Sequence, residues 1–119
     1  MNDYKREHAR LACDIYALCI GYFDDQEKFV KSDVKLKVKV VDFSTVGFGF
    51  MSPYAFHTEK IGSFIFIISG EEYKLKAKIK RVQEANEESF NVGCEFYIEN
   101  ELEQRNVFKI LEKVLVDDI

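Results

Sequence analysis

The stretch that decides the fold is Val34-Lys35-Leu36-Lys37-Val38-Lys39-Val40-Val41-Asp42. Apolar and basic side chains alternate strictly through its first seven residues, and a period of two is typical of a β-strand with one buried face. We therefore expect the valines and the leucine to face a core and the lysines to face solvent. The strand is expected to end at Asp42, before a turn that contains Ser44 and Gly47.

Further strands are expected on both sides of this one. The segment 11–23 is almost continuously apolar, which predicts a strand that is buried on much of both faces. A short aromatic piece follows the turn and ends at Met51, and apolar or alternating segments follow at 64–68, 73–82 and 90–98. Six short strands joined by turns predict a mainly β fold, either a small antiparallel barrel or a sandwich.

The periodicity changes after Glu99. Asn100 is expected to cap a helix over 100–116, because Glu103 stands three positions later in a capping-box arrangement. The apolar residues of this segment recur at helical spacing, namely Leu102, Val107, Ile110, Leu111 and Val114. One apolar helix face predicts that the helix covers one open end of the strands.

Length and charge limit the class of protein. A chain of 119 residues is about the size of one domain, so we expect a single domain over 1–119. Lys and Arg number 17 against 21 Asp and Glu, and the net charge of −4 makes a general nucleic-acid binder an unfavoured class. The longest apolar run, Phe64–Ile68, is far too short to span a membrane. The charged first ten residues do not match a signal peptide, which predicts a cytoplasmic protein.

The cysteines and histidines do not suggest a metal or a disulfide. Cys13, Cys19 and Cys94 form no close pair and are expected to be reduced thiols. His8 and His57 are isolated, so four zinc ligands cannot be assembled. No nucleophile, phosphate-loop or metalloprotease motif occurs, and we expect neither catalysis nor a cofactor.

Two rows of lysines offer an alternative function. If the strands that carry them are neighbours, these lysines form a basic sheet face able to contact nucleic-acid phosphates. The rows comprise Lys35, Lys37 and Lys39 on one strand and Lys74, Lys76, Lys78 and Lys80 on another. Outward lysines are also ordinary protection of a strand's solvent side, and these strands show no exposed aromatics for base stacking. We favour the interpretation in which these lysines only keep the outer side of each strand in contact with solvent.

A sharper constellation joins the start of the chain to the first turn. Arg6 and Arg10 precede the first strand, and guanidinium groups suit phosphate oxygens and the O6/N7 edge of guanine. Asp42 can accept hydrogen bonds from a guanine edge, the Ser44 hydroxyl can bond to phosphate or base, and Gly47 lets the backbone approach a ligand. These residues make one complementary site if the arginine segment folds over the strand end. The alternative is a surface pair of arginines and a capped turn.

These residues resemble the two motifs of the PilZ domain family. Arg6-Glu7-His8-Ala9-Arg10 matches Arg-x-x-x-Arg, and Asp42-Phe43-Ser44-Thr45-Val46-Gly47 matches Asp/Asn-x-Ser-x-x-Gly, about thirty residues later. The segment 91–96 also resembles the family's last strand, and a helix follows as in the family. The resemblance covers essentially the whole chain. It implies a six-stranded antiparallel β-barrel, the PilZ-like split barrel, over 11–98, with the C-terminal helix over 100–116.

The resemblance also implies a function and the roles of residues. PilZ domains are bacterial receptors for cyclic di-GMP, so we expect residues 1–10 to be a mobile arm that closes on the ligand and signals to a protein partner. Arg6 and Arg10 would hold phosphate and guanine edges, Asp42 would bind a guanine, Ser44 would add a polar contact and Gly47 would keep room in the turn. Lys5, next to the first motif arginine, and Gly93 in the last strand are further ligand-binding candidates. Many members that bind two ligand molecules have arginine at the position of Lys5, so the stoichiometry stays open. A ligand-independent protein-docking module is the alternative.

Overall fold

Six antiparallel strands and one helix make up the fold. The structure is a computed structural model that describes residues 10–23 and 29–117. The strands are β1 (Leu11–Phe23), β2 (Phe29–Phe43), β3 (Gly47–Ser52), β4 (Ile61–Ile68), β5 (Glu71–Asn86) and β6 (Ser89–Phe96), and the helix is α2 (Glu101–Asp117). This arrangement confirms the prediction of a mainly β fold with six antiparallel strands and a C-terminal helix. The last strand ends at Phe96, two residues earlier than expected.

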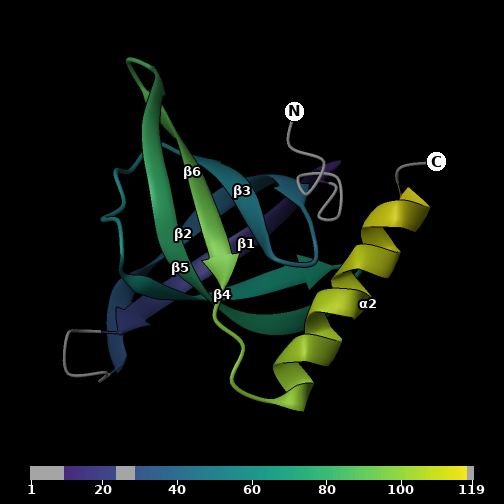
Figure 1. Cartoon of the computed structure of the whole chain (residues 1–119). Coiled ribbons are helices and arrows are strands. Elements are labelled where there is room, and N and C mark those ends of the chain that lie inside the picture. Colours follow the sequence, from purple (N-terminus) through teal and green to yellow (C-terminus); the bar gives the residue numbers. More distant parts are fainter. Residues whose placement is uncertain (1–9, 24–28, 118–119) are drawn as a thin grey trace, which may run out of the picture.

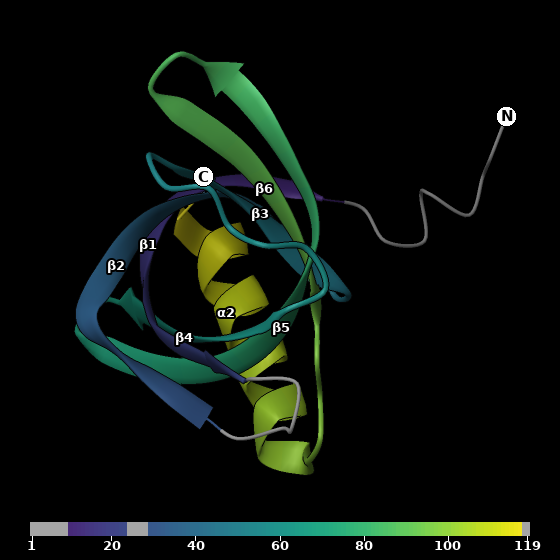
Figure 2. The same ribbon diagram turned by 90° about the vertical axis from the view of Figure 1, so that its left-hand side faces the viewer.

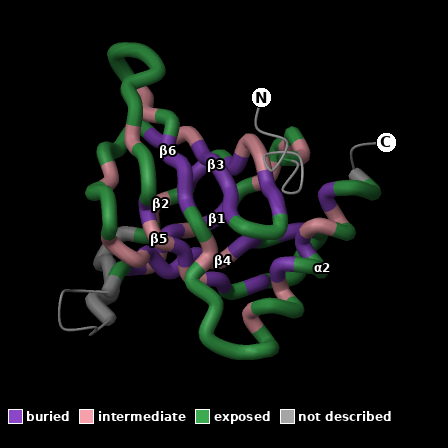
Figure 3. The backbone as a smooth tube through the Cα atoms, in the orientation of Figure 1, coloured by how far each residue is buried: buried purple, intermediate pink, exposed green. Residues whose placement is uncertain are grey.

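The sheet closes on itself. The strand order is β1-β2-β3-β6-β5-β4, and β4 pairs with β1, so every strand has two hydrogen-bonded neighbours. Figure 2 shows the resulting ring, with α2 lying across one of its openings. The β5–β6 hairpin extends beyond the ring, and its tip is exposed (Figures 1 and 3). A closed ring leaves no unpaired strand edge along most of its length.

Phenylalanines fill the interior of the ring. Phe48 is fully buried, and its ring lies 5.0 to 6.2 Å from five other rings. The partners are Phe43, Phe50, Phe64, Phe66 and Phe96. Val38 and Val40 are also buried, as the alternation in β2 predicts. Figure 3 shows buried residues recurring along the strands of the ring.

The first strand departs from the expectation of burial on both faces. Ala17 and Cys19 are buried, but the side chains of Tyr16 and Tyr22 are 45% and 44% exposed. The outer face of β1 is therefore open to solvent. Aromatic rings stabilise strands on either face, so apolar content alone does not distinguish a strand buried on both faces from one with tyrosines outside.

The helix is capped and docked as the sequence indicates. The Glu103 N–H donates to Asn100 Oδ1 over 2.9 Å, which is the predicted cap. Val107, Ile110 and Val114 are buried against the ring, and Lys76 on β5 pairs with Glu99 and Glu103. Burial lowers the pKa of Lys76, but the hydrogen bonds to the two glutamates outweigh it and the net shift is upward. No helix in the described part of the chain is both long and apolar enough to cross a membrane.

Phe48 is expected to be the most sensitive core position. The substitution Phe48→Ala removes a ring from the centre of the aromatic cluster and should lower the free energy of unfolding by about 3–5 kcal/mol. Urea denaturation measures this loss. Tyr54→Ala is the control, because Tyr54 is 49% exposed, and its effect should stay below about 1 kcal/mol. Equal losses for the two variants would contradict a core centred on Phe48.

Candidate functional site

Two sequence motifs meet at the start of β1. Arg10 precedes β1, Asp42 lies near the end of β2, and Ala12 pairs with Asp42 in the sheet register. An Arg10 guanidinium nitrogen lies 2.6 Å from Asp42 Oδ1, and the two side chains are 42% and 31% exposed. The structure therefore brings together one arginine of the first motif and the aspartate of the second. Lys5 and Arg6 lie outside the described residues.

A β-bulge turns Asp42 towards the outer face. Val40 pairs with Phe50 and Asp42 with Gly49, so Val41 is an extra residue on β2. Without it, Asp42 would share the inward face of Val38 and Val40. The bulge shifts the alternation, so Phe43 is buried and Asp42 is partly exposed. Bulges next to functional sites commonly redirect a side chain in this way.

A row of four paired residues crosses the outer face next to this ion pair. Asp42 pairs with Gly49, Gly49 with Gly93, and Gly93 with Arg81, on strands β2, β3, β6 and β5. We call Asp42, Gly49, Gly93 and Arg81 the glycine row. A second bulge, at Lys80, places Arg81 on this face, because Ile79 pairs with Cys94 while Arg81 pairs with Gly93. Asp42 and Arg81 are thus the two ends of the glycine row, and the two residues between them have no side chains.

The side chains of the neighbouring Asp42 and Arg81 occupy the space above the two glycines. A Cβ on Gly49 would lie 2.9 Å from Asp42 Oδ2, and a Cβ on Gly93 would lie 2.9 Å from an Arg81 guanidinium nitrogen. The Asp42 and Arg81 side chains therefore lie over the two glycines. Glycine at such positions lets a flat group approach the backbone closely.

A hollow of about 220 Å³ adjoins the glycine row. Its charged side chains are three cations, Arg10, Lys80 and Arg81, and one acid, Glu95. Gly93 and Cys94 also line it. Burial, and after it the neighbouring Cys19, raises the pKa of the Cys94 thiol well above its usual value, against a smaller lowering by Arg10. The thiol is therefore neutral at physiological pH, and the hollow keeps a net positive charge.

Ser44 and Gly47 build the turn between β2 and β3. Ser44 is fully buried, and its hydroxyl accepts hydrogen bonds from the N–H groups of Val46 and Gly47 at 3.2 and 3.3 Å. The same hydroxyl lies 3.2 Å from the Gly47 carbonyl oxygen, to which it can donate. A Cβ on Gly47 would lie 2.0 Å from the Cys94 carbonyl oxygen, so glycine allows β3 to pair closely with β6. In this conformation both residues shape the turn beside Asp42.

The two lysine rows do not form one surface. Two strands separate β2 from β5 in either direction around the ring. Several of the lysines also have partners of their own. Lys37 lies 4.3 Å from the centre of the Tyr16 ring, Lys39 lies 3.7 Å from Asp14, and Lys80 lies 3.4 Å from Glu59. The condition under which these lysines would favour nucleic-acid binding is therefore not met.

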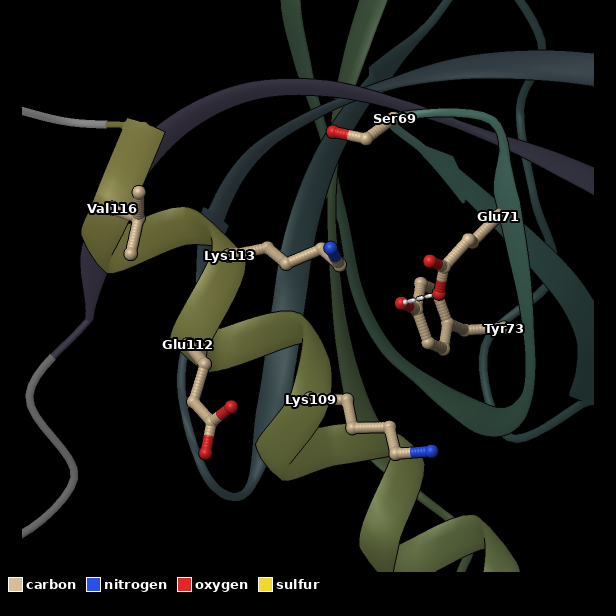
Figure 4. Close-up of a pocket in the computed structure, with 7 residues that line it drawn as sticks. All are labelled: Ser69, Glu71, Tyr73, Lys109, Glu112, Lys113 and Val116. Carbon is tan, nitrogen blue, oxygen red and sulfur yellow. Dashed lines mark hydrogen bonds between the residues drawn. The ribbon is translucent and has the colours of Figure 1, made fainter.

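A second cleft, of about 500 Å³, lies between α2 and the β4–β5 turn (Figure 4). The Tyr73 hydroxyl donates to Glu71 over 2.7 Å, and this bond, with Lys113 next in effect, holds the pKa of Glu71 below its usual value. Lys109 and Lys113 balance Glu71 and Glu112, so the cleft has no excess of either charge. In the described ranges, no cluster of metal-ligating side chains occurs.

Sequence reasoning missed Gly49 and Arg81. The signal for Gly49 was its place two residues after Gly47, on the same face of an expected strand. The signal for Arg81 was an arginine at the end of a lysine alternation. Neither feature of the sequence shows that Gly49 and Arg81 belong to one site, because the two residues come together only through the strand order β3-β6-β5.

Comparisons with known proteins give a consistent picture. The family described as PilZ domain matches residues 4–111. The structure is similar to the PilZ domain with c-di-GMP of YcgR from Escherichia coli, with a TM-score of 0.69 and 10% identity over 96% of this chain and 94% of that chain. It is also similar to the PilZ domain of CeSA from a cellulose-synthesizing bacterium, with a TM-score of 0.62 and 16% identity over 93% and 99% of the two chains. A third similar structure is the K. pneumonia MrkH–c-di-GMP complex, with a TM-score of 0.65 and 16% identity over 95% of this chain and 52% of that chain. The search of curated proteins found no match.

The Arg10–Asp42 pair is expected to contribute little to stability. Both side chains are substantially exposed, so Arg10→Ala and Asp42→Ala should each change the free energy of unfolding by less than about 1 kcal/mol. Urea denaturation of the two variants measures the change.

Gly47→Ala provides the contrast in the same measurement. Its Cβ would meet a backbone carbonyl, so strands must shift, at a cost of about 1–3 kcal/mol. A loss of several kcal/mol for Arg10→Ala would show that the ion pair is structural, and would contradict its interpretation as a binding group.

Proposed function

Because the chain belongs to the PilZ domain family, a family of cyclic di-GMP receptors, we propose that it binds cyclic di-GMP on the glycine row. The observation that carries the proposal is the row itself, where Asp42 and Arg81 flank two paired glycines next to Arg10. Two similar structures, of the YcgR PilZ domain and of MrkH, contain c-di-GMP, which supports this choice of ligand.

The chemistry of the row fits both parts of the ligand. Guanine presents N–H donors on one edge, for which the Asp42 carboxylate is an acceptor, and O6 and N7 acceptors on another, for which a guanidinium is a donor. The phosphates need cations, and Arg10 and Arg81 both line the hollow beside the row. The Asp42 and Arg81 side chains lie over Gly49 and Gly93, so they would turn towards the ligand, and the backbone at the two glycines then gives a planar base room to lie against the sheet.

The ion pair has a direct role in this proposal. Arg10 and Asp42 hold each other in the orientation that the ligand needs, so neither has to be recruited from elsewhere. A carboxylate has about four lone-pair sites and a guanidinium five donors. Asp42 can therefore accept hydrogen bonds from a guanine while some of the Arg10 N–H groups donate hydrogen bonds to the ligand.

The proposed arm comprises residues 1–10, with Arg6 and Lys5 as additional cations for the ligand. Its closure over the bound nucleotide would change the surface around β1, and a protein partner would recognise that changed surface. Ordering a segment costs free energy, which lowers affinity but couples binding to a large change in shape. Ser44 and Gly47 serve the proposed site by holding the turn that presents Asp42. We propose no catalytic step.

Calorimetric titration with cyclic di-GMP tests the proposal. The variants Arg6→Ala, Arg10→Ala, Asp42→Ala and Arg81→Ala should each weaken binding roughly 5- to 150-fold, which corresponds to about 1–3 kcal/mol for a bidentate contact. Arg105→Ala is the matched control, because it removes one guanidinium from the exposed side of α2 and should leave the affinity unchanged.

Two results would overturn parts of this account. No binding by the wild-type chain would exclude the receptor function and leave the protein-docking module. Unchanged affinity in Asp42→Ala and Arg81→Ala, with binding intact in the wild type, would move the ligand away from the glycine row.

A further inference from the structure

An apolar stripe runs along the outer face of two neighbouring strands, β1 and β4. Tyr16 pairs with Ile67 in the sheet register, and Leu18 pairs with Ile65. We call these four residues the outer stripe. On each strand the residue between the two stripe positions is buried inside the ring, so the stripe side chains point outward. Tyr16 and Ile67 are 45% and 42% exposed, and Leu18 and Ile65 are half-buried.

Lysines flank the outer stripe on both sides. On β2, Lys39 pairs with Tyr16 and Lys37 pairs with Leu18. On β5, Lys74 pairs with Ile65. The two lysine rows therefore do not lie side by side, but they border one apolar stripe from its two long edges.

Cations outnumber acids around the stripe. Among the described residues beside it, the acids are Asp14, which lies 3.7 Å from Lys39, and Glu72, which pairs with Ile67. The cations are Lys35, Lys37, Lys39, Lys74 and Lys78, besides Lys76, which pairs with Glu99 and Glu103. This face is therefore positive, whereas the whole chain has a formal net charge of −4.

We propose that the outer stripe and its flanking lysines bind the surface of an anionic lipid bilayer. The apolar side chains enter the boundary between the headgroups and the acyl chains, and the lysines contact the lipid phosphates. Tyrosine suits this boundary, because its ring is apolar and its hydroxyl stays in contact with water. Lysine suits it too, because its methylene stem lies along apolar groups while the ammonium group reaches a phosphate. Lys37, whose Nζ lies 4.3 Å from the centre of the Tyr16 ring, already has this arrangement.

Composition and shape favour a bilayer over a protein partner. Lysine is depleted at protein–protein interfaces, whereas here lysines border the apolar groups on two sides. At the stripe, β1 and β4 are each paired on both sides, so a partner strand finds no edge to join. The outside of a closed ring is convex, so it does not form the groove that a partner helix needs.

The outer stripe faces away from the glycine row. Around the ring, β1 lies three strands from β6, and β4 lies three strands from β3 (Figure 2). Gly93 is on β6 and Gly49 is on β3. A chain held on a bilayer by the outer stripe thus keeps the glycine row turned to solvent. The proposal does not depend on nucleotide binding, and the two can fail separately.

Co-sedimentation with lipid vesicles tests the proposal. We expect the full chain without nucleotide to bind vesicles of phosphatidylcholine and phosphatidylglycerol in equal amounts, but not vesicles of phosphatidylcholine alone. Binding should fall as the ionic strength rises, because salt screens the attraction between lysines and phosphates. Lys37→Glu and Lys74→Glu should each weaken binding about fivefold or more, since one lysine near an anionic surface contributes about that factor. Arg105→Glu makes the same charge change on exposed α2 and should weaken binding far less.

The apolar part of the stripe has its own matched pair of variants. Ile67→Ser should weaken binding several-fold with an unchanged circular dichroism spectrum, because the side chain is already partly exposed. Leu115→Ser removes a similar apolar group, 54% exposed on α2, and should leave binding unchanged.

A tryptophan probe locates the contact. The chain has no tryptophan, so Tyr16→Trp places a single fluorophore on the stripe and Phe108→Trp places one on exposed α2. Emission from Tyr16→Trp should shift to shorter wavelength when phosphatidylglycerol vesicles are added, because the indole enters a less polar region. Emission from Phe108→Trp should not shift.

Two results would overturn the proposal. A wild type that does not bind the phosphatidylglycerol vesicles would exclude the bilayer, and this is the result that a protein-docking face predicts. Equal binding by the wild type, Ile67→Ser and Lys74→Glu would place the lipid contact elsewhere on the chain.

Discussion

The closure of the sheet around the phenylalanine cluster is the constraint on which the rest of the structure depends. Six strands that enclose one core must each turn an apolar side chain inward at every second position, and Phe43, Phe48 and Phe66 meet at the centre. The inward set then determines which residues face outward. Only a bulge can change that assignment within a strand. Register irregularities also occur on β1 and near the end of β5, but the bulges next to the candidate site are those at Val41 on β2 and at Lys80 on β5. The outer face acquires Asp42 and Arg81 at these two points.

The proposed binding surface follows from this local departure from regular alternation. Asp42 and Arg81 lie over glycines of the two strands between them, and Arg10 approaches from the start of β1 to pair with Asp42. The ion pair is exposed enough to exchange partners, whereas the turn that supports it is fixed by the buried Ser44 hydroxyl and the close contact at Gly47. A ligand-binding surface needs a rigid support, which holds the binding groups in place, and an ion pair whose members can bind the ligand instead of each other. The chain belongs to the PilZ domain family, a family of cyclic di-GMP receptors, and the chemistry of the row suits that ligand.

Sequence alone predicts the regular parts of this molecule well. The alternation of Val34–Val40 predicts the inner face of β2, and Asn100 with Glu103 predicts the start of the helix within one residue. It does not predict the bulges, because an extra residue is defined only by the register with a neighbouring strand. For the same reason Gly49 and Arg81 were not identified as site residues, although Asp42 was. The lysine rows illustrate the same limit. The pattern within each strand suggested a shared basic surface, but such a surface requires β2 and β5 to be neighbours, and they are not.

The most direct test of the central claim is amide chemical-shift mapping of the chain during titration with cyclic di-GMP. Glycine amides are well resolved in such spectra, and Gly49 and Gly93 form the floor of the proposed surface. The account predicts that the largest shifts occur at Gly49, Gly93 and Arg81, together with residues next to Asp42, while α2 shifts little. Shifts concentrated at the cleft between α2 and β5, or a spectrum unchanged by the nucleotide, would contradict it.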